Sequence, residues 1–138
     1  MEQLNKLSGL LEPDYNANYW SDDILHTAIE SIQEFKESDW KSLDEIWSEK
    51  PASWQIRLSE TLGEAPPPQA FLLLRKMLRS ENEKVAAKAA TSIRELVLAG
   101  YAGKLDLEEV GILKAIASRS KIYGMTLADL IKKFDSPS

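Results

Sequence analysis

The chain has 138 residues, a formal net charge of −5, no cysteine and one histidine. The lack of cysteine excludes disulfides and thiolate metal sites, and a single histidine cannot form a histidine-rich metal site. Residues 1–20 lack a basic start and an apolar signal-peptide core, and no segment approaches the roughly 20 apolar residues that span a bilayer. We therefore expect one cytoplasmic domain over residues 1–138, without membrane contact.

The N-terminal segment, residues 1–20, joins a leucine-rich stretch to an aromatic one. Its leucines fit a short helix, which Pro13 and the asparagines after it should end. The aromatic residues Tyr15, Tyr19 and Trp20 are therefore expected in a loop. Trp20 is expected to dock on the core, whereas core docking and contact with a partner both remain open for the two tyrosines.

The next stretch is expected to form three helices. Ser21 fits an N-cap with two aspartates in the first turn behind it, and the apolar spacing that follows predicts a helix to about residue 36. A first hairpin is expected over residues 38–64. In this hairpin Ser38-Asp39-Trp40 caps one helix and Gly63 ends the other.

A second hairpin is expected over residues 66–99. A proline triplet precedes an apolar stripe with the three- and four-residue spacing of a helix, which consists of Phe71, Leu74, Met77 and Leu78. Ser80 and Glu83 fit a capping box for the return helix. Four alanines on that helix allow close approach to its neighbours.

The last predicted unit, residues 105–135, is a degenerate terminal hairpin. Asp106 and Glu109 fit another capping box, residues 118–124 form a polar connection, and Thr126 caps the final helix. The whole pattern predicts an all-α fold of about seven helices. We expect these helices to form a short α-solenoid of stacked antiparallel hairpins.

An internal repeat supports this architecture. A shift of 31 residues places core positions of the first hairpin on apolar core positions of the second, and it pairs Trp40 with Phe71, Leu43 with Leu74, Trp47 with Leu78, Trp54 with Val85, Leu58 with Ala89 and Leu62 with Ile93. Pro68, Leu72-Leu73, Leu78, Val85-Ala86, Ala89-Ala90 and Ile93 together resemble a HEAT repeat. The resemblance implies a binding scaffold more firmly than any activity.

Charge is divided unequally along the chain. Residues 1–64 carry 14 acidic and 5 basic side chains, a balance of −9, whereas residues 65–138 carry 8 acidic and 12 basic ones, a balance of +4. The negative charge of residues 1–64 favours attraction of a basic protein surface and disfavours nucleic acid as the ligand. A contribution to solubility explains the asymmetry equally well. All four tryptophans lie in the acidic half, where we expect core packing, with partial exposure at a groove as the alternative.

No catalytic motif accompanies these features. The single histidine, His26, is expected on an outer helix face, and the glycines are scattered at helix ends rather than gathered in a phosphate loop. Acidic pairs such as Asp44-Glu45 are explained by helix capping and solubility. We therefore expect no enzyme activity, no metal and no cofactor.

Part of the acidic half is similar to bacterial immunity proteins. The segments Asp39-Trp40-x-x-Leu43-x-x-Ile46-Trp47 and Trp54-Gln55-x-Arg57-Leu58-x-Glu60-x-Leu62-Gly63 resemble small helical proteins encoded beside polymorphic toxins, including those of contact-dependent growth inhibition systems. The resemblance implies a stoichiometric inhibitor that covers a toxin's active site. Many such toxins are nucleases with basic grooves, whose phosphate ligands an acidic inhibitor can imitate.

The leading hypothesis is a monomeric, non-enzymatic immunity protein that binds a basic toxin domain and not nucleic acid. Its expected contact residues are Tyr19, Asp22, Asp23, Asp39, Asp44, Glu45, Glu49, Glu60 and Glu64. One alternative is a HEAT-like adaptor that joins endogenous proteins and also uses the basic half. Another is a nucleic-acid-acting enzyme that holds phosphates with Arg75, Arg79, Lys84 and Lys88 on the exposed faces of the second hairpin.

Overall fold

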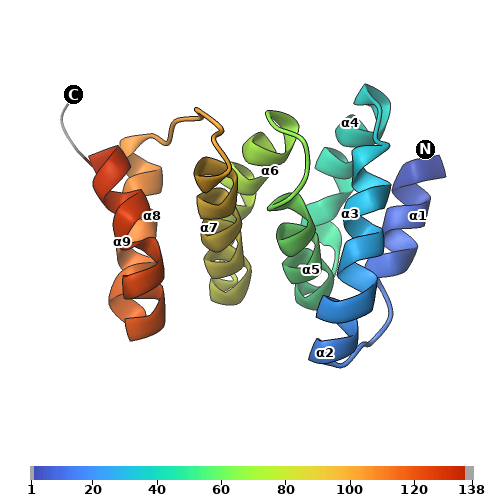
Figure 1. The fold of residues 1–138 in the computed structure, drawn as a ribbon, viewed down its shortest axis with the longest axis horizontal. Helices are drawn as coiled ribbons and strands as arrows, with labels where there is room; N and C mark the ends of the chain where they lie inside the picture. Colours follow the sequence, from blue (N-terminus) through green and yellow to red (C-terminus); the bar gives the residue numbers. More distant parts are fainter. Residues whose placement is uncertain (1, 136–138) are drawn as a thin grey trace.

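The computed structural model describes residues 2–135, which form helices and loops without a strand (Figure 1). The elements are α1 (Glu2–Leu11), α2 (Ala17–Tyr19), a π-helical turn η1 (Trp20–Ile24), α3 (Leu25–Gln33), α4 (Glu37–Ile46), a 3-10 turn η2 (Trp47–Glu49), α5 (Ala52–Leu62), α6 (Gln69–Leu78), α7 (Glu83–Leu98), α8 (Leu107–Arg119) and α9 (Lys121–Asp135). The fold is all-α, as predicted. Residues 1 and 136–138 of the expected domain lie outside the described part.

Because α2, η1 and α3 are continuous and η2 extends α4, residues 2–135 form eight helices, against about seven predicted. Helix α1 is the short helix that the N-terminal leucines fit. The leucines of α1 explain its stability, since Leu4, Leu7 and Leu11 lie on one face and are buried in the core.

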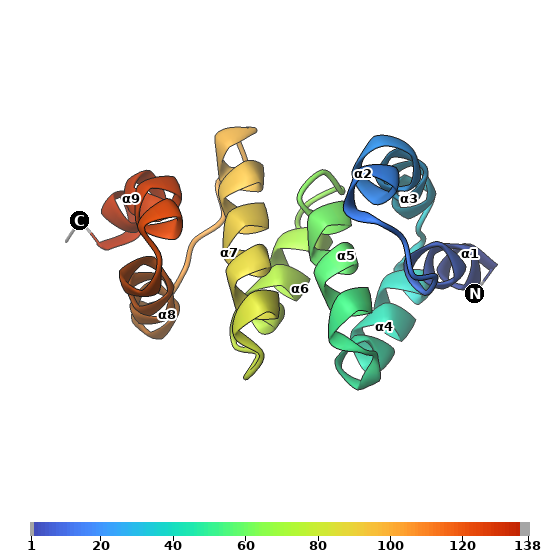
Figure 2. The ribbon, with the colours of Figure 1, turned by 90° about the horizontal axis from the view of Figure 1, so that it is seen from below.

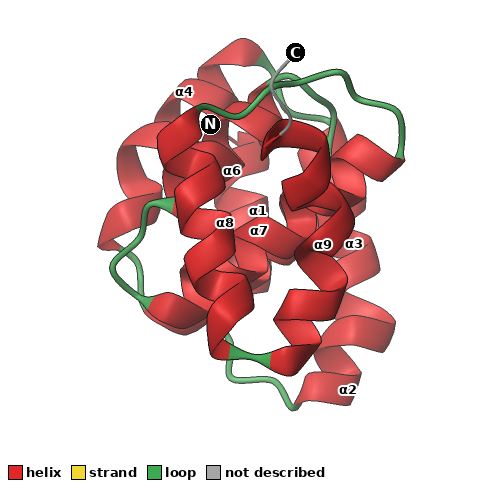
Figure 3. Ribbon diagram, turned by 90° about the vertical axis from the view of Figure 1, so that its left-hand side faces the viewer, coloured by secondary structure: helices red, strands yellow, loops and turns green. Residues whose placement is uncertain are grey.

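The helices lie in two layers along the long axis of the molecule, with α1 near one end and α9 at the other (Figures 1 and 2). In one layer α3, α5, α7 and α9 contact one another in succession. On the other side α1 contacts α4, and α6 contacts α8. Loops at the two ends of the helices join the layers (Figure 3).

The buried positions of α5 recur in α7 at an offset of 31 residues. The buried residues of α5 are Trp54, Gln55, Leu58, Ser59, Thr61 and Leu62, and their counterparts Val85, Ala86, Ala89, Ala90, Ser92 and Ile93 are all buried in α7. The two helices approach closely, since the Ser92 hydroxyl donates a hydrogen bond of 2.6 Å to the Ser59 carbonyl. A Cβ atom on Gly63 would lie 3.1 Å from the Ser92 oxygen, so a larger residue would crowd this contact.

The aromatic stretch after α1 is only partly the expected loop. Tyr15 lies in a loop, as expected, whereas Tyr19 and Trp20 lie in a helix. The side chain of Asn16 accepts a hydrogen bond of 2.8 Å from the amide of Tyr19, so the helix begins at Ala17 rather than after Ser21. The Ser21 hydroxyl instead donates to the carbonyl of Asn18. An asparagine that was taken as a helix breaker therefore caps the helix, while Trp20 is buried as expected.

Two other helices also start at a different residue from the one predicted. The N-cap of α4 is Lys36 rather than Ser38, because the Asp39 carboxylate accepts a 2.9 Å hydrogen bond from the Lys36 amide. The N-cap of α7 is Asn82 rather than Ser80, since the Asn82 side chain accepts from two amides of the first turn, those of Lys84 and Val85. Ser80 accepts from the Asn82 amide, just before the helix.

The capping box of α8 is confirmed, and the predicted cap of α9 is wrong. The Asp106 side chain accepts from the Glu109 amide at 2.7 Å, and the Glu109 side chain accepts from the Asp106 amide at 2.9 Å. Helix α9 already begins at Lys121, because the Ser120 hydroxyl accepts from the Tyr123 amide. Thr126 lies inside the helix, and the expected polar connection over residues 118–124 is reduced to one residue, Ser120.

Candidate functional site

A groove of about 770 Å³ lies between α4 and α6. Each wall is one face of one helix, with residues spaced three, four and seven positions apart. Helix α4 contributes Glu37, Trp40, Lys41 and Asp44, and helix α6 contributes Gln69, Leu72, Leu73 and Lys76. The end of α3 and the connection before α6 complete the lining with Gln33, Phe35 and Pro66.

The groove combines an apolar surface with an ion pair at one end. The ring of Trp40 packs edge-on against Phe35, with 5.2 Å between the ring centres. The Leu72 side chain, which also lines the groove, is 52 % exposed. The Lys76 ammonium lies 2.6 Å and 2.8 Å from the two Asp44 carboxylate oxygens and so connects the walls.

Three predicted contact residues meet where the chain enters α3. Tyr19, Asp22 and Asp23 line one shallow depression of about 480 Å³, and all three are exposed. The ring of Tyr19 packs edge-on against Tyr15 at 5.6 Å between centres. This arrangement presents an aromatic ring beside two carboxylates, which suits a cationic side chain.

Arg57 of α5 fixes the aromatic residues beneath this depression. Its guanidinium centre lies 5.0 Å from the ring centre of Tyr15 and 5.7 Å from that of Trp20, and it donates hydrogen bonds to the carbonyls of Leu11 and Pro13. Burial is the main cause that raises the pKa of Tyr15, and the charge of Arg57 opposes it. Tyr15 is therefore docked on the core, whereas Tyr19 is 48 % exposed.

Glu64 lies apart from these residues, at a pocket of about 630 Å³ beside the end of α7. Glu95 lines the same pocket and was not predicted, and its carboxylate lies 3.5 Å from Arg94. Gly100, two residues after the end of α7, has a φ of 106°, and the Tyr101 amide donates to the Leu96 carbonyl of the last turn. The helix end and the two carboxylates give this pocket a negative potential.

Two predicted contact residues are bound inside the fold instead. Asp39 is only 3 % exposed, and its hydrogen bond from the Lys36 amide is the main cause that lowers the pKa of its carboxyl group. Glu60 is half-buried and accepts a 3.4 Å hydrogen bond from the Trp20 indole. The expectation that both belong to an exposed acidic surface is wrong. Glu45 and Glu49 are exposed and have no ion pair within residues 2–135.

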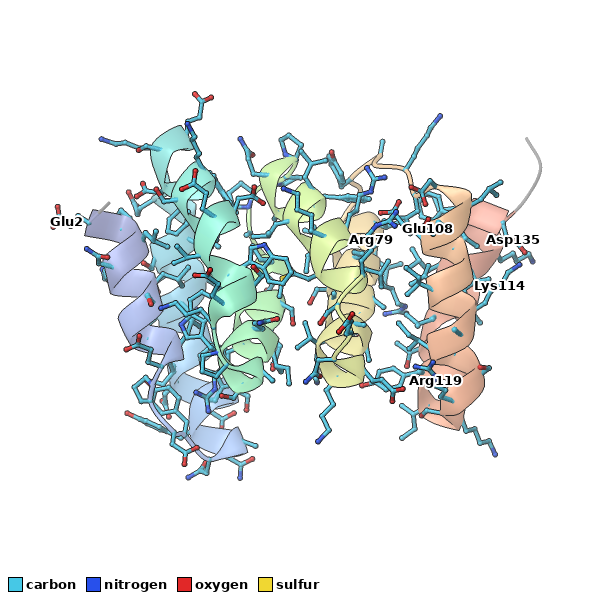
Figure 4. The ribbon with its side chains drawn as sticks, turned by 180° about the vertical axis from the view of Figure 1, so that it is seen from behind. Glu2, Arg79, Glu108, Lys114, Arg119 and Asp135 are labelled. Carbon is cyan, nitrogen blue, oxygen red and sulfur yellow. The ribbon has the colours of Figure 1, made fainter. Side chains whose placement is uncertain are left out.

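The carboxylates of the two halves differ in how they are paired. Of the 14 in residues 1–64, all except Asp39 and Glu60 are exposed, and only a minority lie beside a cation. In the second half most carboxylates are paired. Figure 4 shows Arg79 beside Glu108 and Lys114 beside Asp135, and the latter pair is 2.8 Å apart.

This pairing removes two cations from the expected phosphate-binding group. Arg75 is half-buried and binds the buried Glu109 carboxylate through two nitrogens at 2.8 Å and 2.7 Å, and these hydrogen bonds raise the pKa of Arg75. Arg79 lies beside Asp106 and Glu108. Arg79 is exposed, as predicted, whereas the prediction of an exposed face is wrong for Arg75, which is half-buried. Both arginines are paired with carboxylates at the start of α8.

Sequence reasoning missed the groove between α4 and α6. It favoured core packing for Trp40 and kept partial exposure at a groove as the alternative; Trp40 is half-buried, packs against the core and lines the groove. The signal that was present is Leu72, which lies one position away from the apolar stripe of Phe71 and Leu74.

Within residues 2–135 no three His, Asp or Glu side chains are placed to hold a metal ion, and no helix has the length and apolar character to cross a membrane. His26 is exposed, with its Nε2 atom 2.8 Å from Glu30. Comparisons of this chain with protein-family models, with curated proteins and with solved structures found no match.

Proposed function

We propose that this chain is a short HEAT-like α-solenoid that acts as a non-enzymatic immunity protein, which binds a basic toxin domain and neutralises it. Two features support the solenoid: burial repeats at an offset of 31 residues, and α3, α5, α7 and α9 contact one another in succession. A scaffold of this kind works through its surface, so its function depends on which side chains that surface presents.

The observation that carries this proposal is the unequal pairing of carboxylates. Asp22, Asp23, Glu45, Glu49 and Glu64 are exposed, and none has an ion pair within residues 2–135. In the second half Arg75 and Arg79 form ion pairs with the carboxylates at the start of α8. The exposed carboxylates of the N-terminal half are therefore available to a partner. Their negative charge attracts a basic protein surface and raises the rate of association.

The neutralising step would be steric and electrostatic. A basic nuclease domain holds substrate phosphates with lysine and arginine side chains, and carboxylates at the surface of an inhibitor can occupy the same side chains. Exposed charges mainly accelerate and orient association, while buried apolar contacts supply most of the affinity. Tyr19 and the groove between α4 and α6 offer such contacts.

An affinity pull-down from the source cells tests this function, with the tagged protein as bait and mass spectrometry as the readout. We expect one basic protein in equal proportion to the bait, whose enzymatic activity falls as the bait is added. Recovery of several unrelated proteins, or of nucleic acid, would contradict the inhibitor function.

A second candidate function, a protein adaptor, is favoured by apolar residues at the opposite end of the molecule. Ile122 and Met125 of α9 are each 74 % exposed, and Leu107 of α8 is 83 % exposed. An adaptor would use this end for a second partner. Loss of one co-purified protein in an Ile122→Ser variant, with the basic partner retained, would favour the adaptor.

A further inference from the structure

We infer that the outer face of α9 joins two copies of this chain, with the two α9 helices packed antiparallel about a two-fold axis at Met125. This dimer goes beyond the proposed function, because α9 lies at the end of the molecule opposite α1 and the acidic half (Figure 1). It replaces the monomer expected from the sequence, and each copy keeps its N-terminal half free for a partner.

Helix α9 has an uncovered face. The helix contacts α8 and α7 and ends the row of helices (Figure 2). Its buried residues Leu127 and Leu130 lie on the inner side, whereas Ile122 and Met125 are each 74 % exposed. The terminal helix of a solenoid normally presents a polar outer face. Two large apolar side chains on that face therefore indicate a surface that another chain covers.

The uncovered face is continuous and has the width of a helix contact. Its members are all exposed, and they are Lys121, Ile122, Met125, Ala128 and Asp129. At about 100° per residue these positions lie within an arc of about 120°. The face extends for about 12 Å along the helix, at about 1.5 Å per residue. One neighbouring helix is enough to cover it.

This face is complementary to itself. In an antiparallel pair with its axis at Met125, each residue meets the one that lies equally far on the other side of Met125 in the second copy. Lys121 and Asp129 are each four residues from Met125, so the cation of one copy meets the carboxylate of the other. Ile122 and Ala128 are each three residues away, so a large side chain meets a small one.

Both charged residues are available for this contact. Lys121 and Asp129 are exposed, and neither has an ion pair in the described part of the chain. They are eight residues apart, which is too far along the helix for them to pair within one copy. On the same hairpin Lys114 is instead paired with Asp135, at 2.8 Å. A partner of one charge would satisfy only one of the two residues, whereas a second copy satisfies both.

Sedimentation equilibrium of the purified full-length protein tests the dimer. A single pair of helices buries less surface than a standard interface, so we expect a dissociation constant on the order of 10–100 µM. A protein that stays monomeric up to about 1 mM would overturn the inference and leave this face to a different protein.

Two variants test the position of the axis with matched chemistry. Met125→Glu places two like charges at the axis, and we expect it to weaken dimerisation about tenfold or more. Leu72→Glu changes an exposed leucine of α6, so its dissociation constant should stay within about twofold of the original. A dimer that Leu72→Glu abolishes and Met125→Glu leaves intact would overturn the inference, because the contact would then lie at α6.

A charge exchange tests the antiparallel register. Lys121→Glu alone and Asp129→Lys alone each place like charges opposite one another, so each should weaken dimerisation about fivefold. The double variant exchanges the two charges and should return to within about twofold of the original. Because the two positions do not meet within one copy, this recovery can arise only between copies. A double variant no stronger than the weaker single one would overturn the pairing about Met125.

Discussion

The Arg75 guanidinium of α6 binds the Glu109 carboxylate of α8 through two nitrogens, at 2.8 Å and 2.7 Å. The Glu109 side chain is 1 % exposed, and it also closes the capping box at the start of α8. One carboxylate therefore caps a helix and joins two helices that are distant in sequence.

Replacement of Glu109 by alanine should destabilise the fold strongly. It leaves the half-buried Arg75 charge without its partner and opens the capping box, so we expect a loss of about 3 kcal/mol in the free energy of unfolding, measured by urea denaturation. Glu83→Ala is the control, because Glu83 pairs with Arg119 at an exposed site and should cost less than about 1 kcal/mol. Equal losses in the two variants would contradict this role of Glu109.

Asp39 should make stability depend on pH. The Lys36 hydrogen bond lowers the pKa of Asp39 in the folded state, so the carboxylate stabilises the fold above the unfolded value of about 4. This contribution is lost as the pH falls through the folded pKa. We expect Asp39→Asn to be less stable by about 1 kcal/mol at pH 7, with the difference closing below about pH 4.

Urea denaturation between pH 3 and pH 7 measures this effect, in steps of about one unit. Asp129→Asn is the matched control, since Asp129 is exposed on α9 and has no ion pair within residues 2–135. A difference between Asp39→Asn and the original protein that is the same at every pH would contradict the linkage.

Two glycines should respond to alanine in opposite directions. A Cβ atom on Gly103 would lie 2.8 Å from the buried Phe71 ring, so Gly103→Ala should lower the free energy of unfolding by about 1–3 kcal/mol. Gly111 lies inside α8 with nothing near its Cβ position, so Gly111→Ala should raise it by roughly 0.5–1 kcal/mol. Thermal unfolding shows whether each variant is more or less stable than the original protein. A stabilising Gly103→Ala would refute the close contact.

Local features of the fold could be predicted from the sequence. The pair Asp106 and Glu109 is a capping box because both hydrogen bonds depend on residues three positions apart. The repeat offset was also visible, since a shared core imposes the same apolar spacing on α5 and α7. The N-caps at Asn16 and Asn82 were missed because several polar residues near each helix start can accept the same amide, and packing decides between them.

The candidate site depends on contacts between distant elements, and these were mostly invisible in the sequence. Nothing in the sequence distinguishes Glu60 from Glu45, and only the fold shows that the Trp20 indole donates a hydrogen bond to Glu60. The Asp39 carboxylate is held locally, by the Lys36 amide three residues before it. The groove requires α4 and α6 to lie side by side with Leu72 directed outward. Periodicity gives the buried face of each helix, but it does not show which exposed residues a neighbouring helix brings together.

The most direct test of the account is the dissociation constant between this protein and the basic partner from the pull-down. Glu45→Lys combined with Glu49→Lys should weaken binding about tenfold or more, whereas Glu81→Lys combined with Asp129→Lys in the second half should change it less than about threefold. All four carboxylates are exposed without an ion pair in residues 2–135, so neither double variant should alter the helical content. Equal effects of the two double variants, or none, would contradict an acidic binding surface in the N-terminal half.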